Sequence, residues 1–261
     1  MHNFEFVKPA SIADAAKALG QDGAQALSGG QTLMPTMKQR LAAPSVLVSL
    51  TGIPEMHGVC MDGAGLHIGG ATPHAAVASE AASLYPALAA LAGGIGDPAV
   101  RNRGTIGGSI ANNDPSACYP AAVLASGATV VTNKRKIAAD DYFQGMFTTA
   151  LEEGEFVTGV TFPIPQKAAY VKFNQPASRF ALTGVFVAKF ASGVRVAVTG
   201  ASNNGVFRWA DAEAALSKDF SAAALAGLSA STADLIQDLH GSPAYRANLI
   251  KVLTGRAVTA A

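Results

Sequence analysis

The sequence predicts an α+β fold, in which strands and helices are partly segregated along the chain. Three observations support this class. Residues 1–50 show a β-α-β-α-β pattern, residues 170–199 read as consecutive strands, and helical segments follow residue 210. The proline-rich stretch at 163–166 separates two parts of different character. We therefore predict one domain at residues 1–165 and a second domain at residues 166–261.

The first fifty residues form the first predicted unit. A strand at 4–7 precedes a helix that Ser11 caps, with Asp14 in its first turn. A strand at 25–27 leads into a glycine-rich turn, and a helix at 33–40 follows that turn. The unit ends with one more strand, formed by the apolar run at 46–50.

The middle of the chain predicts an antiparallel sheet covered by helices. A hairpin joins strands at 58–61 and 66–69 through the turn at 62–65. The further elements predicted here are helices at 73–79, 87–92 and 121–124, and strands at 128–132 and 155–161.

The last part predicts a three-stranded antiparallel sheet with helices. Its strands are at 170–173, 183–190 and 194–199, and the tight Ser192-Gly193 turn joins the last two. The helices that follow are predicted at 211–216, 221–228, 231–239 and 244–253.

The composition excludes several classes of protein. The 19 basic and 18 acidic residues leave no cationic excess for binding nucleic acid or an anionic membrane surface. The two cysteines, Cys60 and Cys118, are too few for an iron–sulfur cluster. Because the sequence shows no signal pattern and no apolar run that could span a bilayer, we predict a cytoplasmic protein with reduced thiols. Only 14% of the residues are charged, which either reflects an Ala- and Gly-rich bias or indicates subunit contacts.

Two double-glycine turns are the strongest functional signal in the sequence. They occupy residues 28–32 (SGGQT) and 104–109 (GTIGGS). Glycine lets the backbone approach a ligand and point successive N–H groups at it, and the neighbouring hydroxyls add donors. A single glycine pair would favour an ordinary turn, whereas two such turns predict a large anionic ligand gripped from two sides. A cofactor that contains a diphosphate is the natural candidate.

Other motifs provide no catalytic or metal site. The Gly-x-Gly-x-x-Ala pattern at 94–99 follows a helical stretch instead of a strand, which argues against a Rossmann site. The five histidines are scattered without metal-ligand spacing, so we nominate no catalytic and no metal-binding residue. Asp114 either caps a helix that begins at Pro115 or accepts a hydrogen bond from a cofactor sugar, and the sequence leaves both options open.

The glycine motifs resemble those of one known family. Residues 28–35 resemble the AGG[HQ]SLLP stretch of the flavin subunits of molybdenum hydroxylases, and residues 100–109 are very similar to their VRNRGTIGGS stretch. Residues 111–115 continue the second motif in step. The segments at 170–173 and 180–185 look like the start of the family's C-terminal domain. The resemblance is to the medium, FAD-binding subunit of the carbon monoxide dehydrogenase / xanthine dehydrogenase group.

This resemblance implies a two-lobed FAD-binding domain of the vanillyl-alcohol-oxidase (PCMH) type, with a small lobe at about 1–55 and a larger lobe at about 56–165. It also implies an electron-transfer function. FAD on this chain would receive electrons from two [2Fe–2S] clusters of a small partner, beside a large molybdenum-cofactor subunit, and would pass them to an external acceptor. A dimer of such heterotrimers is expected. The residues that the resemblance assigns to the cofactor site are Ser28, Gly29, Gly30, Gln31, Thr32, Leu33, Thr105, Ile106, Gly107, Gly108, Ser109, Asp114, Tyr170 and Lys172.

Two positions depart from the family pattern. Cys118 stands where many relatives have an acidic residue available to the cofactor, and a thiol is a weak acceptor. Arg179 stands where relatives often have Asp. Two alternatives to the electron-relay subunit therefore stay open: a stand-alone flavin oxidoreductase of the same fold, and a non-enzymatic scaffold that has lost FAD.

Overall fold

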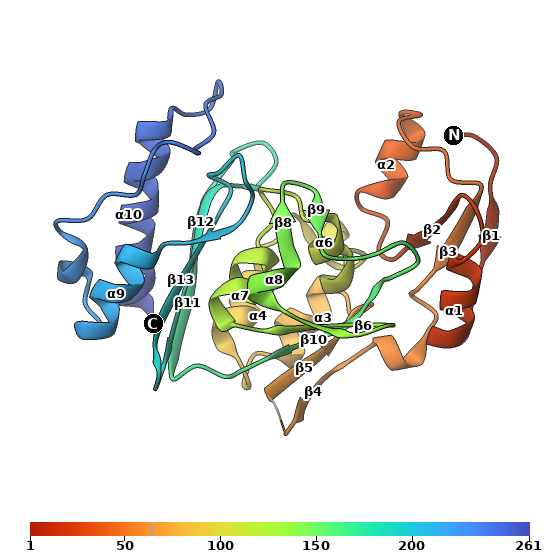
Figure 1. Cartoon of the computed structure of the whole chain (residues 1–261), viewed down its shortest axis with the longest axis horizontal. Coiled ribbons are helices and arrows are strands. Elements are labelled where there is room, and N and C mark those ends of the chain that lie inside the picture. Colours follow the sequence, from red (N-terminus) through yellow and green to blue (C-terminus); the bar gives the residue numbers. More distant parts are fainter. Residues whose placement is uncertain (64) are drawn as a thin grey trace.

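The computed structural model describes residues 1–63 and 65–261, which form three larger sheets in succession along the chain and one two-stranded ribbon (Figure 1). Helices lie in the region of each of these larger sheets, and the predicted α+β class is confirmed. The predicted hairpin turn at 62–65 includes residue 64, which lies outside the described residues, and the strands on either side of it pair as predicted.

The N-terminal sheet is parallel, with the strand order β1-β3-β2. Its region contains β1 (Glu5–Val7), α1 (Ile12–Leu19), β2 (Ala24–Leu27), α2 (Leu33–Lys38) and β3 (Val46–Ser49). Ser11 caps α1 as predicted, because its hydroxyl accepts a hydrogen bond from the N–H of Asp14 at 3.1 Å. The first glycine turn leaves the carboxyl end of β2, which is the end of a parallel sheet where ligands usually bind.

The middle sheet is antiparallel, with the strand order β4-β5-β10-β6-β7. The strands are β4 (Val59–Asp62), β5 (Gly65–Gly69), β6 (Thr129–Thr132), β7 (Lys136–Ala138) and β10 (Val157–Phe162), and β8 (Phe143–Gly145) and β9 (Thr148–Thr149) form a separate ribbon. The helices of this region are η1 (Pro54–Met56), α3 (His74–Glu80), α4 (Pro86–Gly93), α5 (Pro98–Arg101), α6 (Ile106–Asn112), α7 (Tyr119–Ser126) and α8 (Ala139–Tyr142).

The C-terminal sheet is antiparallel and has the order β11-β12-β13-β14. Its strands are β11 (Lys167–Asn174), β12 (Ala181–Phe190), β13 (Gly193–Thr199) and β14 (Phe207–Arg208), and its helices are α9 (Ala210–Lys218), η2 (Ala222–Leu225) and α10 (Pro243–Ala260). Helices α9 and α10 cover one face of this sheet, whereas α4 and α7 lie against the other (Figure 1). All eight residues of α7 are buried because this helix lies between the C-terminal and middle sheets.

Three predictions for the last part of the chain need correction. The sheet has four strands instead of three, because the two-residue strand β14 pairs with Ala197 and Val198 and is too short to show a sequence pattern. The segment at 221–228 forms only the short 3₁₀ helix η2. No helix forms at 231–239, where the N–H of Ile236 donates to the carbonyl of Ala201 and that of Asn203 donates to the carbonyl of Asp234. Tertiary pairing therefore overrides the local helix pattern in this segment.

The described residues contain no helix that is both long enough and apolar enough to cross a bilayer.

Candidate functional site

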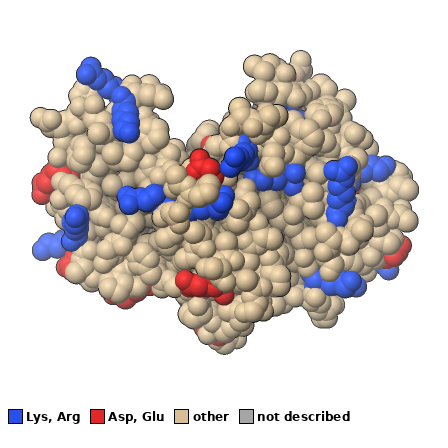
Figure 2. Space-filling model, turned by 180° about the vertical axis from the view of Figure 1, so that it is seen from behind, with Lys and Arg blue, Asp and Glu red and all other residues tan. Residues whose placement is uncertain are grey.

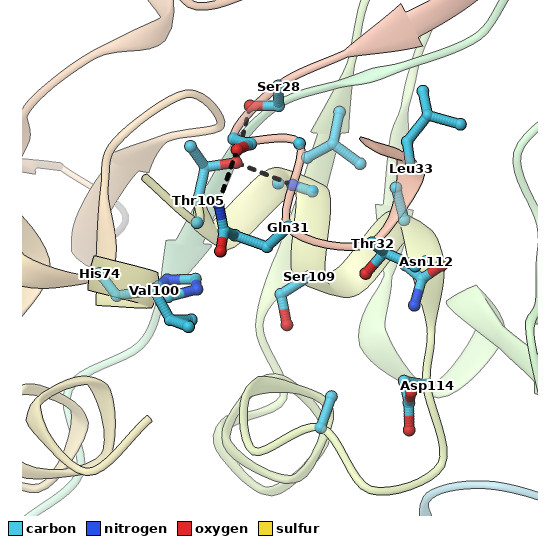
Figure 3. Close-up of a pocket in the computed structure, with 18 of the residues that line it drawn as sticks. Ser28, Gln31, Thr32, Leu33, His74, Val100, Thr105, Ser109, Asn112 and Asp114 are labelled. Carbon is cyan, nitrogen blue, oxygen red and sulfur yellow. Dashed lines mark hydrogen bonds between the residues drawn. The ribbon is translucent and has the colours of Figure 1, made fainter. Parts of the chain in front are cut away.

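A cavity of about 640 Å³ lies where the N-terminal sheet meets the helices of the middle region (Figure 3). Twelve of the fourteen predicted cofactor residues line it: Ser28, Gly29, Gly30, Gln31, Thr32, Leu33, Thr105, Gly107, Gly108, Ser109, Asp114 and Lys172. The two glycine motifs, more than seventy positions apart in sequence, therefore face the same space. This volume is in the range of cofactor pockets.

The two glycine motifs touch each other directly. The hydroxyls of Ser28 and Thr105 share a hydrogen bond of 2.7 Å (Figure 3). Gly29 lies so close to the backbone of Arg103 that a Cβ at position 29 would overlap the Arg103 carbonyl. Gly30 adopts a φ of +70°, which glycine tolerates and other residues rarely adopt. Both glycines are therefore required by the local geometry of the first loop.

The first loop presents an uninterrupted row of free backbone donors. Among the described residues, no acceptor is found for the N–H groups of five consecutive residues, 29–33. The carbonyls of Gly30 and Thr32 accept hydrogen bonds from N–H groups of α2. These bonds fix the loop to the start of that helix. Successive unpaired N–H groups at the start of a helix form a site that favours an anion.

The second motif is built differently, because its backbone donors are already used, except for the N–H of Thr105, which finds no acceptor among the described residues. The N–H groups of Ile106 and Gly107 donate to the carbonyls of Thr72 and Gly70, at 3.3 Å and 2.9 Å. The N–H of Gly108 donates to the hydroxyl of Thr105 at 3.2 Å, as an N-cap of α6. This segment is therefore a closed helix start instead of the row of free donors that the sequence predicts.

The second motif contributes side chains and close packing to the cavity. The hydroxyl of Ser109 makes no hydrogen bond within the described part of the chain, and it points into the cavity (Figure 3). Gly107 packs on the backbone of Gly70, where a Cβ would come within 2.5 Å of the carbonyl oxygen. Ile106 is fully buried in the core and does not line the cavity. The assignment of Ile106 to the cofactor site stays a prediction, with its side chain in the core and its N–H donated to the carbonyl of Thr72.

Asp114 does not cap a helix. Its carboxylate accepts a hydrogen bond from the N–H of Ser116 at 2.8 Å, which closes a local turn, and α7 begins only at Tyr119. Asp114 lines the cavity together with Asn112, which the sequence analysis did not single out (Figure 3). Asn112 lies within the stretch that continues the second motif, so its position in the sequence is a usable signal.

Lys172 lines the cavity, whereas Tyr170 does not. The Lys172 ammonium donates to the carbonyls of Gly94 and Arg179 at 2.8 Å and 2.9 Å, and contacts the Cys118 sulfur at 3.6 Å. The Tyr170 ring stacks on Phe186, with a centroid distance of 6.2 Å. Burial, and then the neighbouring Cys118 thiol, raise the pKa of Tyr170 well above its ordinary value. Tyr170 is thus a neutral packing residue that supports Cys118 from inside.

His74 lines the cavity but was not predicted as a site residue. Only 4% of it is exposed, its ring lies 5.3 Å from that of Tyr119, and a Cβ at Gly104 would come within 2.6 Å of its Nε2 atom. Its Nδ1 atom has no hydrogen-bond partner among the described residues. Burial, and then the charge of Arg101, lower the pKa of His74 to about 4, so the imidazole is neutral at pH 7. His74 stands alone, without a periodic pattern that would reveal it in the sequence.

An ion pair between the buried Glu155 and the exposed Arg135 closes another part of the cavity wall. Glu155 lines the cavity, and its carboxylate accepts hydrogen bonds from the Arg135 guanidinium at 3.1 Å and the Thr132 hydroxyl at 2.6 Å. Burial alone would raise the pKa of Glu155, but these hydrogen bonds outweigh burial and bring it to about 2. The charge of Glu155 is thus matched by Arg135 and does not repel an anion in the cavity.

Comparison with known proteins agrees with this geometry. Residues 2–165 match the family model described as the FAD binding domain in molybdopterin dehydrogenase, so the chain belongs to this family of FAD-binding proteins. It is similar to the nicotine 6-hydroxylase medium subunit of Paenarthrobacter nicotinovorans, with 34% identity over 98% of this chain and 96% of the relative. It is also similar to the carbon monoxide dehydrogenase medium chain of Hydrogenophaga pseudoflava, with 32% identity over 99% and 96% of the two chains.

Solved structures extend the similarity to the whole fold. Quinoline 2-oxidoreductase from Pseudomonas putida 86 superposes with a TM-score of 0.89 and 28% identity, over 100% of this chain and 97% of that chain. Carbon monoxide dehydrogenase from Hydrogenophaga pseudoflava superposes with a TM-score of 0.86 and 33% identity, over the same shares. The chain is therefore an oxidoreductase subunit of the molybdenum hydroxylase type, and FAD is its cofactor.

The cavity has the properties that FAD requires. Free N–H groups at residues 29–33 suit a diphosphate, and the open hydroxyl of Ser109 and the carboxylate of Asp114 suit polar groups of a sugar or ribityl chain. The neutral His74 adds no charge that would have to be compensated. These residues fit the cofactor without any metal ligand or catalytic acid.

Proposed function

We propose that this chain relays electrons through FAD within a multi-subunit molybdenum hydroxylase. Electrons would come from [2Fe–2S] clusters of a small partner subunit, which receives them from a large molybdenum-cofactor subunit, and would leave to an external acceptor. When bound, FAD supplies the ability to accept and release electrons singly or in pairs. The observation that carries the proposal is the row of free N–H groups at 29–33, in the same cavity that Gly107, Gly108 and Ser109 of α6 line.

In this proposal the chain's own residues bind and orient the cofactor. The N–H groups of 29–33 hold the diphosphate, and the hydroxyls of Thr32 and Ser109 complete the set of donors. The packed start of α6 limits how far the cofactor can move toward the middle sheet. Residues 1–165 would carry the cofactor, with small and large lobes meeting near residue 55, and residues 166–261 would close the site through Lys172.

The first experiment tests whether the diphosphate is the part of the cofactor that the chain recognises. The flavin-free chain is titrated with FAD, FMN and riboflavin, and binding is followed by quenching of flavin fluorescence. Because the free donors suit a diphosphate, we expect FAD to bind at least 100-fold more tightly than riboflavin, with FMN between them. Equal affinities for FAD and riboflavin would contradict this placement.

The second experiment tests the relay itself. The chain is co-expressed with the genes for the expected partners, and the purified complex is analysed for flavin, iron and molybdenum. We expect all three in fixed proportion, and we expect the substrate of the complex to bleach the flavin band near neutral pH. A chain that purifies alone with FAD and oxidises a substrate by itself would instead favour a stand-alone flavin oxidoreductase.

A further inference from the structure

Three cationic side chains converge on one short turn at the rim of the cavity. The carbonyls of residues 94–96, which follow α4, accept hydrogen bonds from Lys172 at 2.8 Å and from Arg101 at 3.0 Å. The Arg179 guanidinium donates to the same Gly96 carbonyl at 3.4 Å. Arg101 and Arg179 thus share one acceptor oxygen, although like charges at this separation repel each other.

Arg103 lies two residues after Arg101, in the turn that follows α5, where its N–H donates to the carbonyl of Val100 at 3.2 Å. We group it with the three cations by this position and call Arg101, Arg103, Lys172 and Arg179 the cationic rim. Arg103 is exposed and makes no side-chain hydrogen bond or ion pair among the described residues. From behind, the molecule shows basic side chains along the middle of this face, beside the hollow between the N-terminal sheet and the rest (Figure 2). The whole chain carries a net charge of only +1, so this concentration is local.

Acidic groups only partly balance the cationic rim. A backbone hydrogen bond from Val100, together with the charges of Arg179 and Arg101, lowers the pKa of Asp97, which places this carboxylate beside the rim. Inside the cavity, Glu155 is already paired with Arg135, which leaves Asp114. The four cations of the rim therefore outnumber Asp97 and Asp114. Such a clustering of like charge at a cavity mouth attracts anions and raises their rate of encounter.

We propose that the cationic rim is the docking site of a small, multiply charged anionic electron acceptor. This inference rests on the proposed function, because it concerns the molecule that reoxidises the flavin in this cavity. Lys172 and Arg179 line the cavity themselves, so an anion held at the rim lies at the entrance to the cofactor. The row of free N–H groups at 29–33 supplies the donors for the diphosphate of the cofactor, so the side chains of the rim are available for a second anion.

The probes for this proposal are hexacyanoferrate(III), which is an anion, and N-methylphenazinium, which is a cation. The chain loaded with FAD is reduced anaerobically and mixed with each probe in a stopped-flow instrument, and the rate is expressed per bound flavin. Two hexacyanoferrate(III) ions each take one electron from the reduced flavin, which releases one proton to solvent. One N-methylphenazinium takes two electrons and one proton from it as a hydride.

The test variant is Arg103→Gln/Arg179→Gln, and the control is Lys136→Gln/Lys218→Gln. The control removes the same number of charges at exposed positions outside the cavity lining, and neither lysine makes a side-chain hydrogen bond or ion pair in the described residues. We expect the test variant to reduce hexacyanoferrate(III) about tenfold more slowly at low ionic strength, and N-methylphenazinium no more slowly than the unmodified chain. Salt should remove most of this difference, because it screens exposed charges.

Three outcomes would overturn the inference: an unchanged rate with the anion, an equal loss of rate with both probes, or an equal loss in the control variant. A chain that takes up no flavin is recognised by its missing absorbance before any acceptor is added. That result would reject the proposed function and this inference together. A chain with full flavin content and no selectivity between the probes would reject the inference alone.

Discussion

The two glycine motifs look alike in sequence but do different work in the fold. The first loop, 28–32, has a free row of N–H groups and a glycine with positive φ. The second motif, 104–109, is a tightly packed helix start, and among the described residues all of its N–H groups except that of Thr105 have acceptors. A Gly-Gly pair therefore indicates close backbone approach, but it does not say whether a ligand or another strand approaches. Four substitutions separate these two roles.

Gly29→Val should have the largest effect, because the new side chain would overlap the carbonyl of Arg103 and force the two motifs apart. We expect FAD affinity to fall at least 100-fold, or about 3 kcal/mol, measured by flavin content and fluorescence titration. Gly227→Val is the matched control, because nothing lies within 4 Å of a Cβ at that position. Full flavin content in Gly29→Val would show that contact between the motifs is not needed.

Gly107→Ala tests the packing role of the second motif. Its Cβ would come within 2.5 Å of the carbonyl oxygen of Gly70, on the side of the middle sheet. We expect a loss of about 2–3 kcal/mol in the free energy of unfolding of the flavin-free chain, measured by denaturant titration. The expected clash is thus with the protein itself. Unchanged stability together with lost flavin would instead show that Gly107 contacts the cofactor.

His74→Gln tests whether the buried His74, which packs against Gly104 of the second motif, makes the stability of the chain depend on pH. The pKa of His74 is about 4 in the folded chain, compared with about 6.5 in an unfolded chain. Above pH 6.5 both states hold a neutral imidazole. As the pH falls from 6.5 to 4, mainly the unfolded state takes up the proton, so the free energy of unfolding falls by about 3 kcal/mol. The variant should lose less free energy of unfolding than the unmodified chain between pH 6.5 and pH 4. If this free energy falls equally with pH in both proteins, His74 is not the source of the loss.

Gly108→Ala should have the smallest effect on folding and a selective effect on binding. Its Cβ would lie 3.0 Å from the Thr105 hydroxyl and 3.6 Å from the Ser28 Cβ, at the junction with the first loop. We expect the stability of the flavin-free chain to be kept, because alanine favours a helix, and FAD affinity to fall about tenfold. The opposite ranking of the Gly107 and Gly108 variants would contradict the division of roles between neighbouring glycines.

Local sequence patterns predicted most of the secondary structure, and the family resemblance assigned twelve of the residues that line the cavity. They succeeded where one short segment contains the whole signal, as with the Ser11 cap of α1 and the glycine motifs. They failed where distant segments decide the outcome. Residues 231–239 pair with the turn after β13 instead of forming a helix, and Tyr170 turns toward Phe186 and Cys118 instead of lining the cavity.

The α+β fold and the two glycine motifs of the flavin-subunit kind follow from the amino-acid sequence, because periodicity and backbone freedom are local properties. Which motif keeps a row of free N–H groups depends on folding, because hydrogen bonds from the start of α6 go to Gly70 and Thr72, more than thirty positions away in sequence. Folding also decided that His74 is buried and neutral beneath the second motif. The gathering of Lys172, Arg101 and Arg179 on one turn is likewise a product of folding, because three separate elements must meet to form it.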